Sequence, residues 1–204
     1  MVPFLDWGNI ACGAHASDPA HMLETVELAQ RHSVKIGAHP GYADRANFGR
    51  VSLAMPHDEI TDLVKSQVEL LQSMAVVDYI KPHGALYNDM MQNLEVFNAI
   101  LTAANQHQLP LMLLAGNFPE HHALATQAGV KLWHEAFADR AYTADGQLVP
   151  RSEDNAVHQT TDLIVQQAQH FIKHPPYRID TLCLHGDHPV SVKAAPQLRQ
   201  LIDC

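Results

Sequence analysis

Four histidines occupy similar places in the sequence, each at or just after the end of a short apolar run and within two residues of a glycine. They are His15, His39, His83 and His185. An imidazole has an ordinary pKa of about 6.5, so it can exchange a proton at neutral pH or bind a metal ion as a neutral ring. A single histidine is usually structural, but four at equivalent positions favour one shared functional site.

Carboxylates and cations accompany these histidines in the same loops. Histidines with carboxylates suit two chemistries, a divalent metal that activates water and metal-free general acid–base catalysis, and the sequence leaves both open. Arginine and lysine can hold an anionic substrate through charge-assisted hydrogen bonds, and loop tyrosines can line its pocket. We therefore predict catalytic roles for the four histidines with Asp139 and Asp187, and substrate binding by Tyr42, Arg50, Lys81, Asn88 and Arg140.

Several familiar catalytic motifs are missing from the sequence. It contains no HExxH and no paired-cysteine spacing, so a metal site would depend on side chains that meet only in space. It has no GxSxG for a nucleophilic serine, and neither a Walker A nor a GxGxxG loop for phosphates. If the activity uses ATP, we expect the nucleotide to bind elsewhere.

The elements that must position these residues alternate along the chain. Apolar strand-like runs cover 7–12, 34–39, 76–80, 109–115, 130–137 and 181–184, and helical patterns cover 19–32, 56–74, 94–105, 119–128, 160–172 and the segment from 189. Six strands and six helices in alternation predict a single α/β domain over 1–204 with a parallel sheet. Right-handed crossovers then bring every strand's carboxyl end, with its histidine or carboxylate, to one edge.

Composition limits the partners and the location. There are 13 Lys and Arg against 22 Asp and Glu, a formal charge of -9, and no basic run that could follow a phosphate backbone, so we expect no nucleic-acid partner. No apolar run reaches the roughly 20 residues that span a bilayer and no secretory signal is visible, which predicts a cytoplasmic protein without a membrane partner. Cys12, Cys183 and Cys204 form no CxxC pair, which argues against disulfides.

The chain also contains histidines on predicted helices, where no convergence is expected. We predict that these lie at the surface: His21, His57, His107, His121, His122, His158 and His170. With all 15 histidines of the chain protonated, the formal charge would move from -9 to -9 + 15 = +6. Solubility should therefore depend on pH below about 6.5.

Five stretches of the chain resemble the LamB/YcsF family of bacterial ATP-dependent 5-oxoprolinase subunits: NIACGAHASDP (9–19), IGAHPGYADRANFGR (36–50), KPHGALYN (81–88), FADRAYTADGQLVPRS (137–152) and LHGDHP (184–189). The resemblance covers nearly the whole chain in order. It implies a seven-stranded type of β/α barrel, of the glycoside hydrolase/deacetylase kind, with six strands visible here. It also implies ATP-driven hydrolysis of 5-oxo-L-proline to L-glutamate together with two partner subunits, which are expected to hold the ATP.

The chain departs from the family pattern in three places. It has Ala14 and Ser17 where the family usually has Phe and Gly, and His188 where the family has Asn. Family members also begin with a strand that carries an Asp-Leu-Asn…Asp-Leu-Gly-Glu type motif, and this chain starts about one βα segment too late to contain it. A barrel without that strand is expected to leave unpaired edges.

The resemblance suggests roles for the predicted residues. His39 and His83 would position or deprotonate water, Asp187 would orient His185 or another imidazole, and Arg140 or Lys81 would hold the substrate's carboxylate or a phosphoryl group. Two alternatives stay open. One is a metal-dependent, deacetylase-like amide hydrolase, for which a divalent metal is expected. The other is a catalytically impaired binding subunit.

Overall fold

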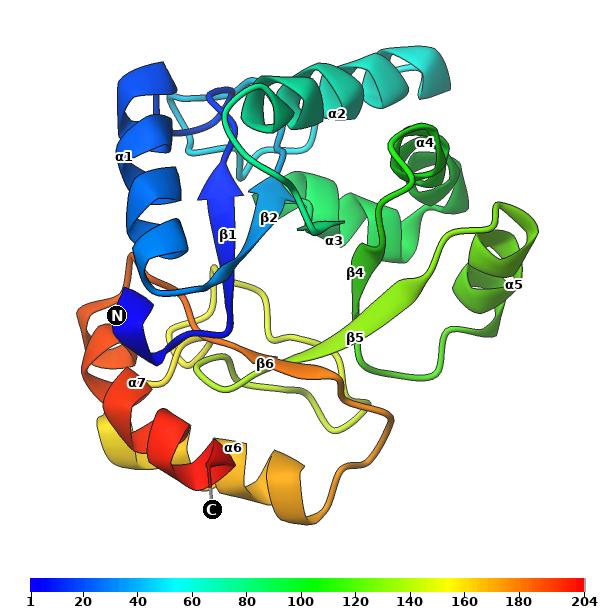
Figure 1. The fold of residues 1–204 in the computed structure, drawn as a ribbon. Coiled ribbons are helices and arrows are strands. Elements are labelled where there is room, and N and C mark those ends of the chain that lie inside the picture. The colour runs from blue at the N-terminus through cyan, green and yellow to red at the C-terminus, as the bar shows by residue number, and fades with distance from the viewer. Residues whose placement is uncertain (204) are drawn as a thin grey trace.

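A computed structural model describes residues 1–203 of the chain. Its six strands form one sheet in which every neighbouring pair is parallel, in the order β1-β2-β3-β4-β5-β6 (Figure 1). The predicted parallel α/β architecture is therefore confirmed. The strands are β1 (Trp7–Ala11), β2 (Lys35–His39), β3 (Tyr79–Ile80), β4 (Leu111–Leu114), β5 (Leu132–Phe137) and β6 (Thr181–Cys183).

The helices between the strands correct one prediction, because there are seven α-helices in the described residues and not six. The additional helix, α3, starts at Gly84, directly after His83, and its apolar side chains Leu86 and Met90 are fully buried. The sequence pattern conceals it because Asn93 both ends α3 and caps the next helix, so no loop separates the two. The helices are α1 (Pro19–Arg31), α2 (His57–Gln72), α3 (Gly84–Gln92), α4 (Leu94–Gln106), α5 (Pro119–Gln127), α6 (Thr161–Lys173) and α7 (Pro189–Ile202), preceded by the short 3-10 helix η1 (Val2–Phe4).

Strand β3 is shorter than the apolar run 76–80 predicts. The cause is Asp78, whose backbone N–H donates to Ile36 O (2.7 Å) and whose carboxylate accepts from Ile36 N (2.9 Å). A side chain thus takes the place of a backbone partner at the start of the strand. Val76 is 83% exposed and lies outside the sheet.

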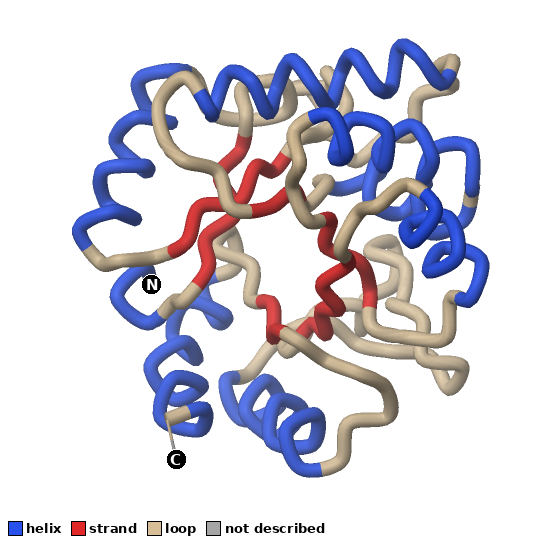
Figure 2. The backbone as a smooth tube through the Cα atoms, turned by 45° about the vertical axis from the view of Figure 1, so that its right-hand side comes forward, coloured by secondary structure: helices blue, strands red, loops and turns tan. Residues whose placement is uncertain are grey.

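The sheet curls into a half-barrel with the helices outside it, as Figure 2 shows. Among residues 1–203, β1 and β6 each pair with a strand on one side only, in line with the predicted unpaired edges. The start of the chain and the last helix lie together near this gap, where Arg199 Nη1 donates to Asp6 Oδ2 (2.8 Å). No helix in the described part of the chain is long and apolar enough to cross a membrane.

Two apolar cores hold the half-barrel together. The large core joins β1 to β5 with α1 to α5, and its centre includes the fully buried Phe97, Ile100 and Leu113. A small core joins α6 and α7 around Ile164 and Leu198. Cys12 and Cys183 are buried and unbridged, as predicted, and Cys204 lies outside the described residues.

Candidate active site

The carboxyl ends of the strands open into a cavity of about 1290 Å³, whose lining also includes residues at the amino ends of strands, such as Asp6 and Asp180. The register of the sheet explains why the histidines meet there. Ala11 of β1 lies opposite His39 of β2, so the loop that carries His15 leaves the sheet at the level of His39. All four predicted histidines line this cavity, together with Asp187, Arg50, Lys81, Asn88 and Arg140, whereas Asp139 and Tyr42 lie behind its wall.

Three of the histidines form a compact group, which we call the histidine stack: His15, His39 and His83. The rings of His15 and His83 are parallel within 2°, with their centroids 3.9 Å apart. The ring of His39 stands nearly at right angles to both. Its Nε2 lies 3.0 Å from His83 Nδ1. Three side chains from separate loops therefore present their ring nitrogens at one place.

Backbone carbonyls fix the tautomers of this group. His39 Nδ1 lies 2.6 Å from Lys81 O and His83 Nε2 lies 2.8 Å from Phe48 O, and a carbonyl can only accept, so both nitrogens must carry a hydrogen. If both rings are neutral, no hydrogen is left for the contact between His39 Nε2 and His83 Nδ1. The two lone pairs then face each other, and a proton delivered to the stack would be shared between the two nitrogens.

Burial keeps these imidazoles neutral. Desolvation, together with the charges of neighbouring rings and Arg45, lowers the pKa of His15 to about 3. Desolvation likewise lowers the pKa of His83 to about 4, and burial with the charges of His83 and Lys81 lowers the pKa of His39 well below its ordinary value. At pH 7 the three rings of the stack are thus neutral.

Glycines create the space in which the stack packs. A Cβ atom on Gly41 would lie 2.7 Å from His15 Nδ1, and one on Gly49 would lie 2.8 Å from His15 Cβ. Gly84 has φ +55, and a Cβ there would lie 2.5 Å from Gly49 O. The glycines that follow the histidines in the sequence therefore allow the close approach of backbone and ring.

The fourth histidine has a different partner. His185 Nδ1 lies 2.9 Å from Asp139 Oδ1, while its backbone N–H donates to Asp139 Oδ2 (2.7 Å). Ser191 Oγ also donates to that carboxylate (2.7 Å). Asp139 is fully buried, which raises its pKa, but the hydrogen bonds and the charge of His185 outweigh burial and lower it overall. Asp139 thus holds His185 with Nε2 directed away from the carboxylate.

This pair corrects the role predicted for Asp187. Asp187 was expected to orient His185, but its carboxylate accepts from Arg50 Nη2 (2.9 Å) at the rim of the cavity. Asp139 orients His185 instead, from 46 residues away in the sequence. Sequence proximity favoured Asp187, whereas the parallel pairing of β5 with β6 brings Asp139 to His185.

Three predicted substrate-binding residues are engaged elsewhere. Lys81 Nζ donates to Glu135 Oε2 (2.5 Å) and Cys183 Sγ (3.0 Å), inside the barrel. The guanidinium of Arg140 donates to the carbonyls of Ala156 and Val149 and is buried. Tyr42 is buried and donates to Asp89 Oδ2 (2.8 Å). The expectation that Lys81 or Arg140 holds a carboxylate therefore does not fit their contacts.

Two other arginines are better placed at the rim. Arg50 and Arg151 both have exposed side chains that line the cavity. Burial within the surrounding loops and the charge of Arg50 lower the pKa of Arg151. Asn88 is also exposed on the cavity wall. Adjacent cations of this kind attract an anion.

One residue of this site, Glu135, was not predicted from the sequence at all. It lies inside β5, is fully buried and lines the cavity. Its signal was an acidic residue in the otherwise apolar run 132–137, since a carboxylate is rarely buried without a partner. Its partner Lys81 is 54 residues away in the sequence.

Metal binding was left open by the sequence. Within residues 1–203, no three His, Cys, Asp or Glu side chains are placed to hold a metal ion together. In the stack, the facing nitrogens of His39 and His83 contact each other, and these two residues do not make up a three-ligand site. The metal stays a prediction.

The helix histidines show a mixed outcome. His21 and His170 are exposed as predicted, but the prediction for His121 is wrong, because it is buried and its Nε2 lies 2.9 Å from Met90 O. His122 Nε2 lies 2.8 Å from His134 Nε2, and His134 Nδ1 lies 2.9 Å from Asp180 Oδ2. This second histidine pair does not line the active-site cavity.

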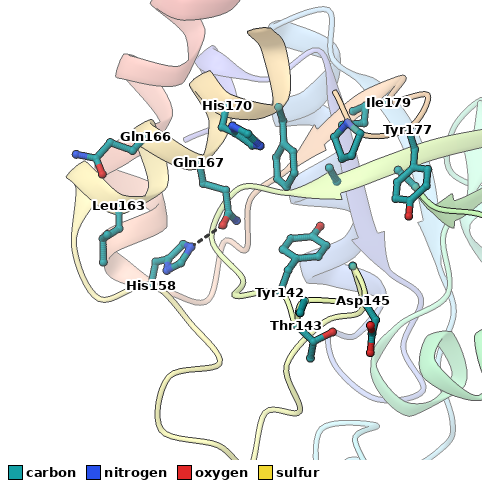
Figure 3. A pocket seen from close by; sticks show the side chains of 16 residues that line it. Tyr142, Thr143, Asp145, His158, Leu163, Gln166, Gln167, His170, Tyr177 and Ile179 are labelled. Carbon is teal, nitrogen blue, oxygen red and sulfur yellow. Dashed lines mark hydrogen bonds between the residues drawn. The ribbon is translucent and has the colours of Figure 1, made fainter. Parts of the chain in front are cut away.

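A further cavity of about 670 Å³ lies between α6, the turn around Asp145 and the segment around Tyr177 (Figure 3). Tyr142 projects into it from the loop, and His158 and Gln167 form a hydrogen bond on its wall (2.9 Å). None of the six predicted catalytic residues lines this cavity. The chemistry predicted from the sequence therefore belongs to the larger cavity.

Comparisons with known proteins agree with this geometry. The model of the LamB/YcsF family matches residues 1–204. A 5-oxoprolinase subunit from Vibrio cholerae is 42% identical over 219 residues, which cover 100% of this chain and 89% of the relative. A 5-oxoprolinase subunit from Pseudomonas putida is 44% identical, with 100% of this chain and 86% of the relative covered. The crystal structure of a lactam utilization protein from Thermus thermophilus superimposes with a TM-score of 0.89 at 31% identity, covering 99% of this chain and 88% of that one.

Proposed function

We propose that this chain, which belongs to the LamB/YcsF family, is a subunit of a 5-oxoprolinase and opens the lactam ring of 5-oxoproline to give glutamate. The observation that carries the proposal is that two groups lie at the same cavity: the neutral imidazoles of the histidine stack, and His185 with its partner Asp139. Hydrolysis of an amide needs both a base for water and an acid for the departing nitrogen. The two groups supply candidates for each role.

In this proposal the stack accepts a proton from water. When both rings are neutral, His39 Nε2 and His83 Nδ1 face each other without a hydrogen between them, so a proton taken from water can be shared by the two nitrogens. The hydroxide equivalent adds to the lactam carbonyl carbon, and the ring C–N bond then breaks. His185, which donates from Nδ1 to Asp139, enters this step with a proton on Nε2 as well and gives that proton to the nitrogen. The stack then releases its proton to solvent and His185 takes one up, so the site returns to its starting state. Water is consumed, and the products are the new carboxylate and the amine of glutamate.

The substrate also carries a carboxylate, for which the rim arginines offer a site. Arg50 and Arg151 are exposed cations on the cavity wall, whereas Lys81 and Arg140 are engaged with protein groups. We therefore assign the substrate carboxylate to Arg50 and Arg151. Asp187, which now pairs with Arg50, would give way to it.

An unstrained lactam resists hydrolysis. We propose that partner subunits hydrolyse ATP and that this drives the opening of the lactam ring on this chain. The word "subunit" in the names of the relatives supports an assembly. The absence of a Walker A or GxGxxG loop from the sequence supports a nucleotide site on another chain. We therefore expect this chain alone to form no glutamate from 5-oxoproline.

The test is glutamate release from 5-oxoproline by the chain combined with its partner subunits, with and without ATP. We expect ATP-dependent glutamate formation that falls by about 10²-fold or more in His39→Ala and in His83→Ala, because each loses a base. The exposed His170→Ala serves as the matched control and should retain full activity. Full activity in both stack variants would remove the stack from the mechanism.

A metal-dependent amide hydrolase remains the competing candidate, and the same preparation separates the two. Activity of the chain alone, without ATP or partners and with a stoichiometric divalent metal by elemental analysis, would support that alternative and contradict the proposal.

A further inference from the structure

Two side chains at the start of α7 continue the contacts of Asp139 away from the active-site cavity. His188 is the residue before the helix and Ser191 lies in its first turn. Ser191 is fully buried, and its hydroxyl oxygen lies 2.7 Å from Asp139 Oδ2 and 3.2 Å from His188 Nδ1. A hydrogen-bonded row of four side chains therefore runs from His188 through Ser191 and Asp139 to His185. The side chains of Ser191 and His188 have no part yet in the proposed reaction.

The chemistry of these groups fixes the direction of each hydrogen bond in the row. Burial raises the pKa of Asp139, but the hydrogen bonds and charge of His185 and the hydroxyl of Ser191 lower it overall, so Asp139 is ionised. An ionised carboxylate can only accept, and the single hydrogen of the Ser191 hydroxyl is therefore directed at Asp139. The oxygen of Ser191 is then left as an acceptor, so His188 Nδ1 must carry a hydrogen. Every bond in the row thus points toward Asp139.

This arrangement holds the carboxylate of Asp139 in one orientation. Oδ2 accepts from Ser191 and from the backbone N–H of His185 (2.7 Å), while Oδ1 lies 2.9 Å from His185 Nδ1. Nδ1 is only 3.1 Å from Oδ2, so a carboxylate that turns about its Cβ–Cγ bond can exchange its two oxygens at the ring. The Ser191 hydroxyl opposes that turn. Because a donor that itself accepts a hydrogen bond is polarised and donates more strongly, His188 strengthens the contact of Ser191 with Asp139.

We propose that Ser191 and His188 are positioning residues of the reaction, which fix the orientation of Asp139 and, through it, the ring of His185. This inference rests on the proposed function and adds to it two residues that do not line the cavity. It also gives a reason for one departure from the family pattern, which has Asn where this chain has His188. The side-chain nitrogen of Asn and the Nδ1 of histidine are both bonded to Cγ, so either residue can donate to Ser191.

The first test is Ser191→Ala in the complex with its partner subunits, because this change removes the hydroxyl and keeps a good helix former in α7. We expect kcat for glutamate release to fall about tenfold while KM stays within about twofold, since a hydrogen bond to a charged group is lost outside the substrate site. Ser52→Ala is the matched control and should leave both constants unchanged. Ser52 also donates to a carboxylate, that of Asp89 (2.8 Å), and neither residue lines the cavity. Equal kcat in Ser191→Ala and wild type would overturn the inference.

A double-mutant cycle separates positioning through Asp139 from a general loss of packing. If Ser191 acts through the carboxylate, Ser191→Ala should cost less than about twofold in kcat when Asp139→Asn is already present, because the group that it positions is gone. Independent losses would instead multiply. A further loss of about tenfold in the Asp139→Asn background would therefore contradict the proposal.

Variants of His188 test the donor at the far end of the row. His188→Asn keeps a nitrogen donor on Cγ and should keep kcat within about twofold of wild type, whereas His188→Leu has no donor and should lower kcat about threefold. A role of the imidazole ring in packing alone predicts the same loss in both variants. Equal kcat in His188→Asn and His188→Leu would overturn the role of His188.

The full chain without partners gives a readout that does not depend on glutamate. In its ¹H NMR spectrum, the hydrogen between His185 Nδ1 and Asp139 should exchange with solvent about tenfold faster in Ser191→Ala than in wild type or Ser52→Ala, because the carboxylate is held less firmly. If the wild-type complex makes no glutamate, the proposed function fails, and this exchange rate still tests the positioning of Asp139. An unchanged exchange rate would then overturn the inference.

Discussion

The two halves of the rim use the same side chain in different surroundings. On β1 to β3, the histidine stack surrounds its imidazoles with other imidazoles and backbone carbonyls, and burial lowers their pKa values. On β5 and β6, His185 instead lies against a buried carboxylate with three hydrogen-bond donors around it. The partner thus decides what an imidazole does. The rings of the stack are held neutral by burial, whereas the ring of His185 is held in place by its carboxylate partner.

Activity should respond most strongly to substitution in the half of the rim on β5 and β6, where His185 lies against Asp139. Asp139→Asn keeps the size of the side chain but removes the carboxylate that accepts from His185 Nδ1 and from its backbone N–H. We expect glutamate production by the assembled complex to fall by about 10²- to 10⁴-fold. Asp187→Asn, in the loop that carries His185, is the control, and its loss should be smaller, because Asp187 is exposed and pairs with Arg50. An equal loss in the two variants would mean that the halves do not differ as described.

On acidification, the two halves of the rim should lower the free energy of unfolding in different pH ranges. His15 and His83 have lowered pKa values in the folded state, so between about pH 6.5 and 4 the unfolded chain binds more protons. The free energy of unfolding should then fall by up to about 1.4 kcal/mol per imidazole for each pH unit of acidification. The lowered pKa of Asp139 adds a loss that begins only below about pH 3.9.

Urea unfolding midpoints, measured between about pH 6.5 and 4 and again below about pH 3.9, test both expected losses of stability. His15→Phe keeps a ring in the stack and should make the slope between pH 6.5 and 4 shallower, while leaving the loss below pH 3.9. A slope that the substitution does not change would show that His15 is not kept neutral by the fold.

Packing of the stack should depend on its glycines. Gly41→Ala would place a methyl group 2.7 Å from His15 Nδ1 and should cost about 1–3 kcal/mol of unfolding free energy. Gly8→Ala, whose nearest neighbour is a Val34 methyl group at 3.3 Å, is the matched control with a smaller cost. Denaturant midpoints of the two variants test the difference, and equal midpoints would argue against tight packing around His15.

The smallest effect is expected from the second histidine pair. His122→Gln removes a ring that contacts His134, away from the active-site cavity. Activity should stay within about twofold of wild type, with at most about 1 kcal/mol lost from stability. A large loss of activity would extend the functional region beyond the rim.

The sequence predicts the rim well because its signals are local. Apolar runs that end in His39 or His185 place those residues at strand ends, and parallel pairing brings the ends together. Pairing between individual side chains is not local. Asp139 with His185, and Lys81 with Glu135, are separated by 46 and 54 residues, so composition and periodicity could not pair them.

The sequence also predicts the wrong role for a buried loop residue, for a related reason. Tyr42 occurs among polar loop residues, which favours ligand binding, yet Asp89 from α3 satisfies its hydroxyl inside the protein. Because α3 was not predicted, its packing against the loop could not be anticipated. A helix boundary without a linker leaves no break in the pattern of apolar and polar residues.

The order of the strands repeats the order of the chain, and this has a consequence for biosynthesis. Each strand emerging from the ribosome finds its only earlier neighbour already made, so the sheet can grow from its N-terminal side during translation. At about 5–20 residues per second, the second half of the chain takes several seconds to follow. During that interval β3 is the growing edge, and its two residues, Tyr79 and Ile80, offer little backbone for a nascent chain nearby to pair with.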